Sequence, residues 1–252
     1  MKSSFLILMA VLVAILTVLG TMVVSPVAAA DDVKITGSAF VYKGIRYFRA
    51  KSENVDLGSY GEKKTPLTQA NYLAVQNKVK ADNLAKINVN ISGPYSIDWA
   101  KFSSTDVNAG INYLKAGGAT AAFSHDAAKK ADLKLVKIYI NEGPLKTLLN
   151  NHADGARNYM ADEGDDARIA SEIWVAMEAE LASQITNDFN ITGEASSGGF
   201  TVEFSASTSS TKKSTITIPP NTTFAYLLHK VTKWSNNKTK VEDMEDDQQS
   251  LN

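Results

Sequence analysis

The chain has 252 residues, of which 44% are hydrophobic and 21% charged, a balance typical of globular rather than disordered proteins. Its formal net charge of −1 gives none of the basic excess that binding to nucleic acid requires, so no nucleic-acid partner is expected. The absence of cysteine excludes disulfide bonds, thiol catalysis and cysteine-ligated metal centres.

The N-terminal residues have the pattern of an export signal. Lys2 precedes an uncharged apolar run over residues 5–24, and a proline and three alanines follow before the first acidic residue. This pattern predicts a signal peptide over residues 1–30, cleaved after Ala30. Because the run reaches the length of about 20 residues that a spanning helix needs, the alternative is an uncleaved membrane anchor. Either way, the protein is expected outside the cytoplasm, secreted or periplasmic.

The next part of the chain mixes predicted strands and helices. Aromatic and β-branched residues on both sides of Lys43-Gly44 predict two short strands over residues 33–49, and a polar loop over residues 51–64 follows. Thr65-Pro66 begins a predicted helix that runs to about Ala81. The following predictions are a strand over residues 87–91 ended by Gly93-Pro94, a helix from Ser104 to Gly117-Gly118, and strands over residues 119–124 and 133–140.

Residues 172–181 are ambiguous, because their side chains favour a helix by propensity whereas their apolar residues alternate as in a strand. We predict a strand there. Before it, Gly143-Pro144 begins a predicted helix to about Met160, and an acidic loop over residues 162–166 follows. The last predicted elements are strands over residues 200–205, 216–218 and 223–230, with a turn at Pro219-Pro220-Asn221.

These elements predict an α+β domain over residues 31–234, with helices packed on a twisted, mainly antiparallel sheet. The charged residues 235–252 predict a disordered tail.

No motif predicts catalysis, a cofactor or a metal site, so we expect a protein that is not an enzyme. His152 with Asp154 could ligate a metal, but a solvated helical face explains the pair more simply. The acidic loop lacks the alternating oxygen spacing and the distal glutamate of an EF-hand. Glu178 and Glu180 share a face of the predicted strand, but exposed solubilising charges explain them more simply than acid–base catalysis. Paired lysines are candidates for contact with anionic lipid headgroups: Lys63, Lys64, Lys129, Lys130, Lys212 and Lys213.

One segment near the C-terminus, ITIPPNTTFAYLLHKVTKW, combines an alternating strand, a short turn, an Ala-Tyr pair and a basic-apolar strand. This order resembles the closing strand of gasdermin pore-forming domains, and residues 173–185 resemble the strand that precedes it. The resemblance covers the C-terminal half, whereas the first half shares only a strand-rich character. The matching positions are Ile216, Ile218, Pro219, Thr223, Ala225 and Tyr226.

Gasdermins bind acidic lipids, oligomerise and insert amphipathic hairpins into the membrane. The resemblance therefore implies that residues 200–218 and 87–140 form such hairpins, with an anionic membrane and further copies of the chain as partners. The chain departs from the family in its export signal and in having a short tail, at most an inhibitory peptide, where gasdermins carry a repressor domain. The alternative is an extracytoplasmic binding, adhesion or envelope structural module, whose alternating strands simply place one face on a core.

Overall fold

The structure, a computed structural model, describes residues 33–50, 54–64, 72–186, 189–196, 198–205 and 213–248. The predicted signal peptide or anchor, the predicted helix start at Thr65-Pro66, and Lys212 lie outside these residues. In the part of the chain that is described, no helix has the length and apolar character needed to cross a bilayer.

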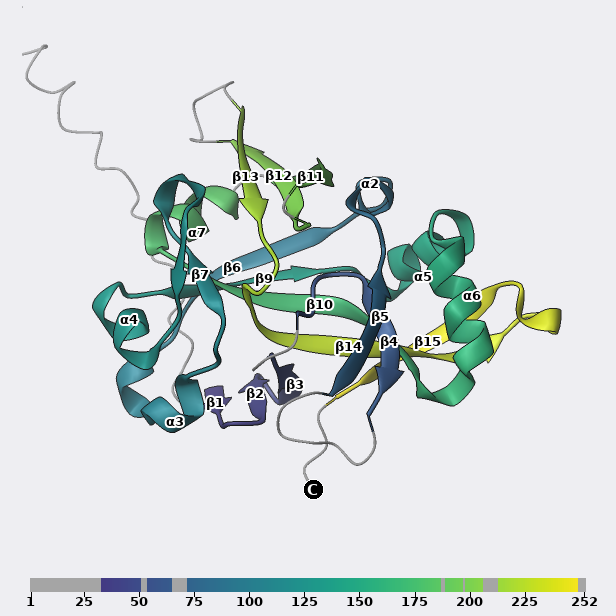
Figure 1. Cartoon of the computed structure of the whole chain (residues 1–252), viewed down its shortest axis with the longest axis horizontal. Helices are drawn as coiled ribbons and strands as arrows, with labels where there is room; N and C mark the ends of the chain where they lie inside the picture. The colour runs from purple at the N-terminus through teal and green to yellow at the C-terminus, as the bar shows by residue number, and fades with distance from the viewer. Residues whose placement is uncertain are drawn as a thin grey trace, which may run out of the picture.

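A twelve-stranded, mainly antiparallel sheet forms the centre of the molecule (Figure 1). Its main path runs β1-β2-β3-β14-β10-β4-β5, with β15 paired to β14, and β7 and β9 paired to the other end of β10. The β10–β7 pairing is parallel. The strands are β1 (Val33–Ile35), β2 (Ala39–Tyr42), β3 (Ile45–Arg49), β4 (Ser59–Lys63), β5 (Leu73–Lys78), β6 (Asn90–Ser96), β7 (Asn112–Leu114), β8 (Thr120–Ala122), β9 (Lys134–Tyr139), β10 (Ala167–Met177), β14 (Thr223–Trp234) and β15 (Val241–Asp247).

Helices pack around this sheet. The longest are α5 (Glu142–Asn151) and α6 (Asp154–Glu163), which lie beside β15 at one end of the molecule (Figure 1). The shorter helices are α2 (Ala81–Leu84), α3 (Ser104–Val107), α4 (His125–Lys130) and α7 (Ala179–Ile185), with 3-10 turns η2 (Trp99–Lys101), η3 (Ala116–Gly118), η4 (Gly164–Asp166) and η5 (Asn236–Lys238). Together with the sheet, they confirm the predicted α+β class.

Strand β10 lies at the centre of the core, and all of its 11 residues are buried. Ile173 and Val175 belong to one apolar cluster, whereas Trp174 and Ala176 belong to another. Because successive strand residues point to opposite faces, the two clusters cover the two faces of β10. This double coverage explains why even Glu172 is buried.

A second, three-stranded antiparallel sheet consists of β11 (Asn190–Glu194), β12 (Phe200–Ser205) and β13 (Lys213–Ile218). Within the described residues, its strands pair with each other and not with the main sheet. Along β12, three buried residues, Phe200, Val202 and Phe204, alternate with partly exposed ones. The hairpin of β12 and β13 is therefore amphipathic and is attached to the main body by side-chain packing.

Several strands lie where the sequence predicts them. The Lys43-Gly44 turn joins β2 and β3, the predicted strands at residues 119–124 and 133–140 are β8 and β9, and β14 begins at Thr223 as expected. For residues 172–181, the alternation of apolar residues predicts the first part of the segment, and the helix propensity predicts the second part. The strand ends at Met177, and α7 then takes the helix-favouring residues from Ala179.

Other local predictions are wrong. Residues 73–78 form β5 rather than a helix, residues 59–63 form β4 rather than a loop, and residues 112–114 form β7 rather than the end of a helix. In each case, a neighbouring strand supplies backbone hydrogen-bond partners that outweigh local propensity. Gly93-Pro94 lies inside β6 and does not end it.

The predicted helix from Gly143 to Met160 is divided into α5 and α6. Ala153 has a non-helical backbone between them, and Arg157 Nη1 donates to the carbonyl oxygen of Asn150 at 3.1 Å. This bond supplies a donor for one of the free carbonyl groups at the end of α5.

A close backbone approach joins β4 to β5. A Cβ atom added at Gly61 would lie 1.9 Å from the carbonyl oxygen of Ala74. We therefore expect Gly61→Ala to lower the free energy of unfolding by about 2 kcal/mol, measured by urea denaturation. The matched control is Gly143→Ala in α5, where no atom lies within 4 Å and little loss is expected. Equal unfolding midpoints for the two variants would contradict the close approach.

Candidate functional site

The C-terminal strand β15 is the least expected element of the structure. It pairs with the second half of β14 in a register that runs from Leu228 opposite Asp247 to Trp234 opposite Val241. Val241 and Met244 are buried in the apolar core. The prediction of a disordered tail is therefore wrong for residues 235–248, and residues 249–252 lie outside the described part of the chain.

Every acidic side chain of β15 lies within ion-pair distance of a basic one from another part of the fold. The pairs are Glu242–Lys233 at 2.9 Å, Asp243–Lys146 at 3.9 Å, Glu245–Lys230 at 2.7 Å, Asp246–His229 at 3.1 Å, Asp247–Lys63 at 2.7 Å and Asp247–Arg168 at 2.6 Å. We call Lys63, Lys146, Arg168, Lys230 and Lys233 the cationic clasp. Four elements supply it: β4, α5, β10 and β14.

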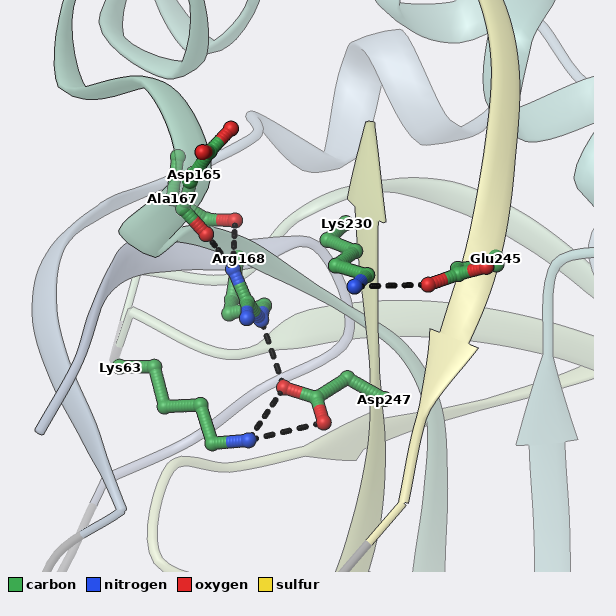
Figure 2. Close-up of polar contacts among 7 residues, drawn as sticks. All are labelled: Lys63, Asp165, Ala167, Arg168, Lys230, Glu245 and Asp247. Atoms are coloured by element: carbon green, nitrogen blue, oxygen red, sulfur yellow. Dashed lines mark hydrogen bonds and ion pairs between the residues drawn. The ribbon is translucent and has the colours of Figure 1, made fainter. Parts of the chain in front are cut away.

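Asp247 is the most strongly held of these acids (Figure 2). Its carboxylate accepts from Arg168 Nε and from Lys63 Nζ, and Arg168 also donates to the carbonyl oxygens of Asp165 and Ala167. Burial by itself raises the pKa of Asp247, but the hydrogen bonds from Arg168 and Lys63 outweigh it and hold the pKa below its usual value. The carboxylate therefore stays ionised to a lower pH than an aspartate with the usual pKa.

Side chains of helix α5 form hydrogen bonds with the backbone of β15. Asn150 donates from Nδ2 to the carbonyl oxygen of Val241 at 3.0 Å, and accepts from the Val241 amide through Oδ1 at 2.8 Å. Lys146 Nζ donates to the carbonyl oxygen of Glu242 at 3.3 Å. An acidic strand is thus fixed between β14 and the side chains of α5.

His229 of β14 connects β15 to the interior. Its Nδ1 lies 2.6 Å from Ser171 Oγ on β10, and its Nε2 lies 3.1 Å from Asp246 Oδ1. Burial lowers the pKa of His229, while the nearby carboxylates of Asp246 and Glu142 oppose that shift.

Ser171, His229 and Asp246 are the residue types of a hydrolase triad. Ser171 is only 1% exposed, however, so a substrate cannot reach its hydroxyl group. The cluster joins three strands and does not form a nucleophilic site.

A second buried carboxylate, Glu172, lies next to this serine in sequence. It accepts from Trp174 Nε1 at 3.0 Å and lies 3.4 Å from Lys137 Nζ. Burial raises the pKa of Glu172, and Lys137 counteracts the shift in part. Four aromatic rings surround Trp174, so this carboxylate also belongs to the core.

The cleft nearest to His152 has a volume of about 310 Å³ and lies between β5 and α6. His152 and Asp154 both line it, but Asp154 pairs with Arg157 at 3.0 Å. Within the described residues, no group of three or more His, Asp or Glu side chains is placed to hold a metal ion. The cleft therefore offers no metal centre built from these side chains.

The predicted lipid-contact lysines lie apart from one another. Lys63 belongs to the cationic clasp, and Lys64 follows it at the end of β4. Lys129 and Lys130 end α4, where Lys129 pairs with Asp126 at 3.3 Å. Lys213 begins β13 and pairs with Glu203. Because α4, β13 and β4 lie in different parts of the molecule (Figure 1), the doublets do not form one surface.

Sequence reasoning missed four members of the clasp: Lys146, Arg168, Lys230 and Lys233. A signal for the last two was present, because the basic residues of HKVTKW are followed closely by the acidic run VEDMEDD, as in a strand pair of opposite charge.

Glu178 and Glu180 do not share a strand face, because β10 ends before them. Glu178 accepts from the amide of Ala116 at 2.8 Å, and Glu180 lies in α7.

The positions on which the gasdermin resemblance was predicted are mostly structural. Ile216 and Ile218 are buried in β13, and Pro219 lies in the turn that leads to β14, where its carbonyl oxygen accepts from Thr222 Oγ1 at 2.8 Å. Thr223, Ala225 and Tyr226 are buried at the start of β14. Comparison of the chain with protein-family models, characterised proteins and solved structures finds no match.

Proposed function

We propose that this protein is an exported membrane-binding protein that attaches to anionic lipid through the cationic clasp after β15 leaves it. The observation that supports this proposal is the complete charge pairing of β15: an acidic strand occupies cations in the way that lipid phosphates would. Release of β15 leaves the five basic side chains without these carboxylates. Each such cation near an anionic surface contributes about 1 kcal/mol to binding.

The small sheet supports a second step, in which the hairpin over residues 200–218 enters the bilayer and copies of the chain assemble. Residues on β12 alternate between apolar side chains and Thr201, Glu203 and Ser205, as a strand between lipid and a wet lumen requires. β12 and β13 have six residues each in the structure, so each would extend by about three residues to reach the length of a transmembrane strand. Detachment of this sheet leaves the pairing of the main sheet intact. The resemblance to gasdermins agrees with this sequence of events.

The test compares residues 31–252 with residues 31–234, which lack β15. We expect the shorter chain to co-sediment with anionic vesicles and to release a trapped dye, and the longer chain to do so weakly. Neutral vesicles should bind neither form. Circular dichroism and urea unfolding serve as the check that the shorter chain, which lacks the core residues Val241 and Met244, is folded.

Charge variants of the shorter chain test the site itself. Lys230→Glu with Lys233→Glu should abolish binding to anionic vesicles. The matched control is Lys129→Glu with Lys130→Glu on α4, which changes the net charge equally outside the clasp and should keep most of the binding. Equal losses would show that net charge, not the clasp, governs attachment.

A disulfide lock separates binding from insertion. A Cβ atom at Gly118 would lie 3.4 Å from Ile216 Cγ1, so Gly118→Cys with Ile216→Cys brings two thiols close enough to tie β13 to η3 in a chain that has no other cysteine. The positive φ of 84° at Gly118 makes cysteine there strained, so formation of the disulfide is checked by thiol titration. We expect the oxidised variant of the shorter chain to bind vesicles without releasing dye, and a reductant to restore release. If neither chain binds lipid, the protein is better explained as an extracytoplasmic binding or structural module.

A further inference from the structure

His229 is a titratable group held between three strands, and the membrane mechanism above does not use it. The residue is 8% exposed and lies directly opposite Asp246 in the β14–β15 register. Its two ring nitrogens are both engaged, one by Ser171 of β10 and the other by Asp246 of β15. The ring therefore links the attachment of β15 to the interior of the main sheet.

The two hydrogen bonds define the form of the ring that fits this site. With Nε2–H donating to Asp246, the neutral ring accepts at Nδ1 from the hydroxyl of Ser171. A second proton on Nδ1 would reverse that bond, and the Ser171 hydroxyl would have to donate elsewhere. The acceptor beside it is the carbonyl oxygen of Leu227, at a long 3.4 Å. Protonation thus replaces a short hydrogen bond by a poorer arrangement and places a cation in the sheet.

We propose that protonation of His229 loosens β15 from β14, so that the strand opens more often as the pH falls below about 6.5. The idea that this loosening prepares the protein for membrane binding rests on the proposed function. The loosening of β15 itself does not depend on that function.

The charged groups around the ring do not reverse this direction. Asp246 of β15 and Glu142 of α5 favour the protonated form, but Glu142 is already paired with Lys146 at 2.7 Å, and β10 presents the neutral Ser171. Burial is the larger effect, and it lowers the pKa of His229 from 6.5. Stability from the neutral ring is complete above that pH and is lost as the pH falls from 6.5 towards the pKa of the docked state.

Asp247, the most strongly held carboxylate of β15, does not account for a change in the same pH range. The pKa of Asp247 is lowered, so its pairs with Lys63 and Arg168 persist while His229 titrates. A variant that lacks His229 therefore shows whether loosening between pH 7.5 and 5.5 comes from the histidine.

The test uses residues 31–252 without lipid and a single cysteine, Met244→Cys, on the buried side of β15. A thiol reagent reaches this position only when the strand opens, and the rate is divided by that of the same variant unfolded in urea at each pH. We expect the normalised rate to rise about threefold between pH 7.5 and 5.5. The same measurement with Leu148→Cys in α5 reports opening of the whole core, so a lower normalised rate there than at Met244→Cys would show that β15 opens by itself.

Two further measurements complete the test. His229→Gln added to Met244→Cys should make the labelling rate nearly independent of pH in this range. In the unsubstituted chain, the NMR signal of the His229 ring should titrate with a midpoint below 6.5. A flat labelling rate with His229 present, or a midpoint at or above 6.5, would overturn the inference. Because no membrane is present, this failure is distinct from a failure of lipid binding.

Discussion

Trp174→Ala should lower the free energy of unfolding by about 4 kcal/mol, measured by urea denaturation. Trp174 is fully buried, and its ring centroid lies 5.0 Å from that of Phe40, 5.2 Å from Tyr42, 5.4 Å from Tyr47 and 5.2 Å from Tyr95. These rings come from β2, β3 and β6, so the indole joins strands that are far apart in sequence. The substitution leaves a large cavity in the centre of the sheet.

Trp174→Phe serves as the matched control. It keeps most of the aromatic volume but removes the Nε1–H group that donates to Glu172. Leaving this buried carboxylate without one donor should cost about 2 kcal/mol, clearly less than the alanine variant. A loss below about 1 kcal/mol for Trp174→Ala would show that the aromatic cluster does not hold the two halves of the sheet together.

Asp247→Ala should cost about 3 kcal/mol, because it leaves Arg168 and Lys63 partly buried without their shared carboxylate. The lowered pKa of Asp247 adds a dependence on acid. Its contribution is complete above the ordinary value of 3.8 and is lost as the pH falls below that value. Urea unfolding at neutral pH and near pH 3 should therefore show a smaller difference between wild type and variant at the lower pH.

The matched control is Glu245→Ala on the same strand, whose pair with Lys230 lies at the surface (Figure 2). Exposed pairs contribute little, so a cost below about 1 kcal/mol is expected. Adding Arg168→Met to Asp247→Ala should recover part of the lost stability, since it removes the unpaired buried charge. Equal costs for Asp247→Ala and Glu245→Ala would contradict the central place of Asp247 in the clasp.

The candidate site was only partly accessible to sequence reasoning. Lys63 was selected because it precedes another lysine, yet its place in the clasp depends on Asp247, which lies 184 positions away. Arg168 and Lys146 carry no local signal at all. Charge pairing across strands depends on register, and register is set by the pairing of β14 with β10 and β15.

The small sheet shows the opposite case. Alternation of Phe200, Val202 and Phe204 with polar neighbours predicts both the strand and its buried face, and the structure agrees. The alternation does not predict which element packs against the buried face of β12. Strand β12 packs on α7, whose residues the sequence placed at the end of a strand.

The elements that can be predicted from the sequence are those whose side chains carry their own periodic or turn signal: the Lys43-Gly44 hairpin, β9, β12 and the first part of β14. The strands β5 and β7 depend on tertiary structure, and so does β15, for which the sequence carries only the opposite charges of HKVTKW and VEDMEDD. These segments are short, polar or charged, and have no apolar period long enough to select a strand. They become strands because a neighbour supplies hydrogen-bond partners and, for β15, because the folded sheet brings cations to each of its carboxylates.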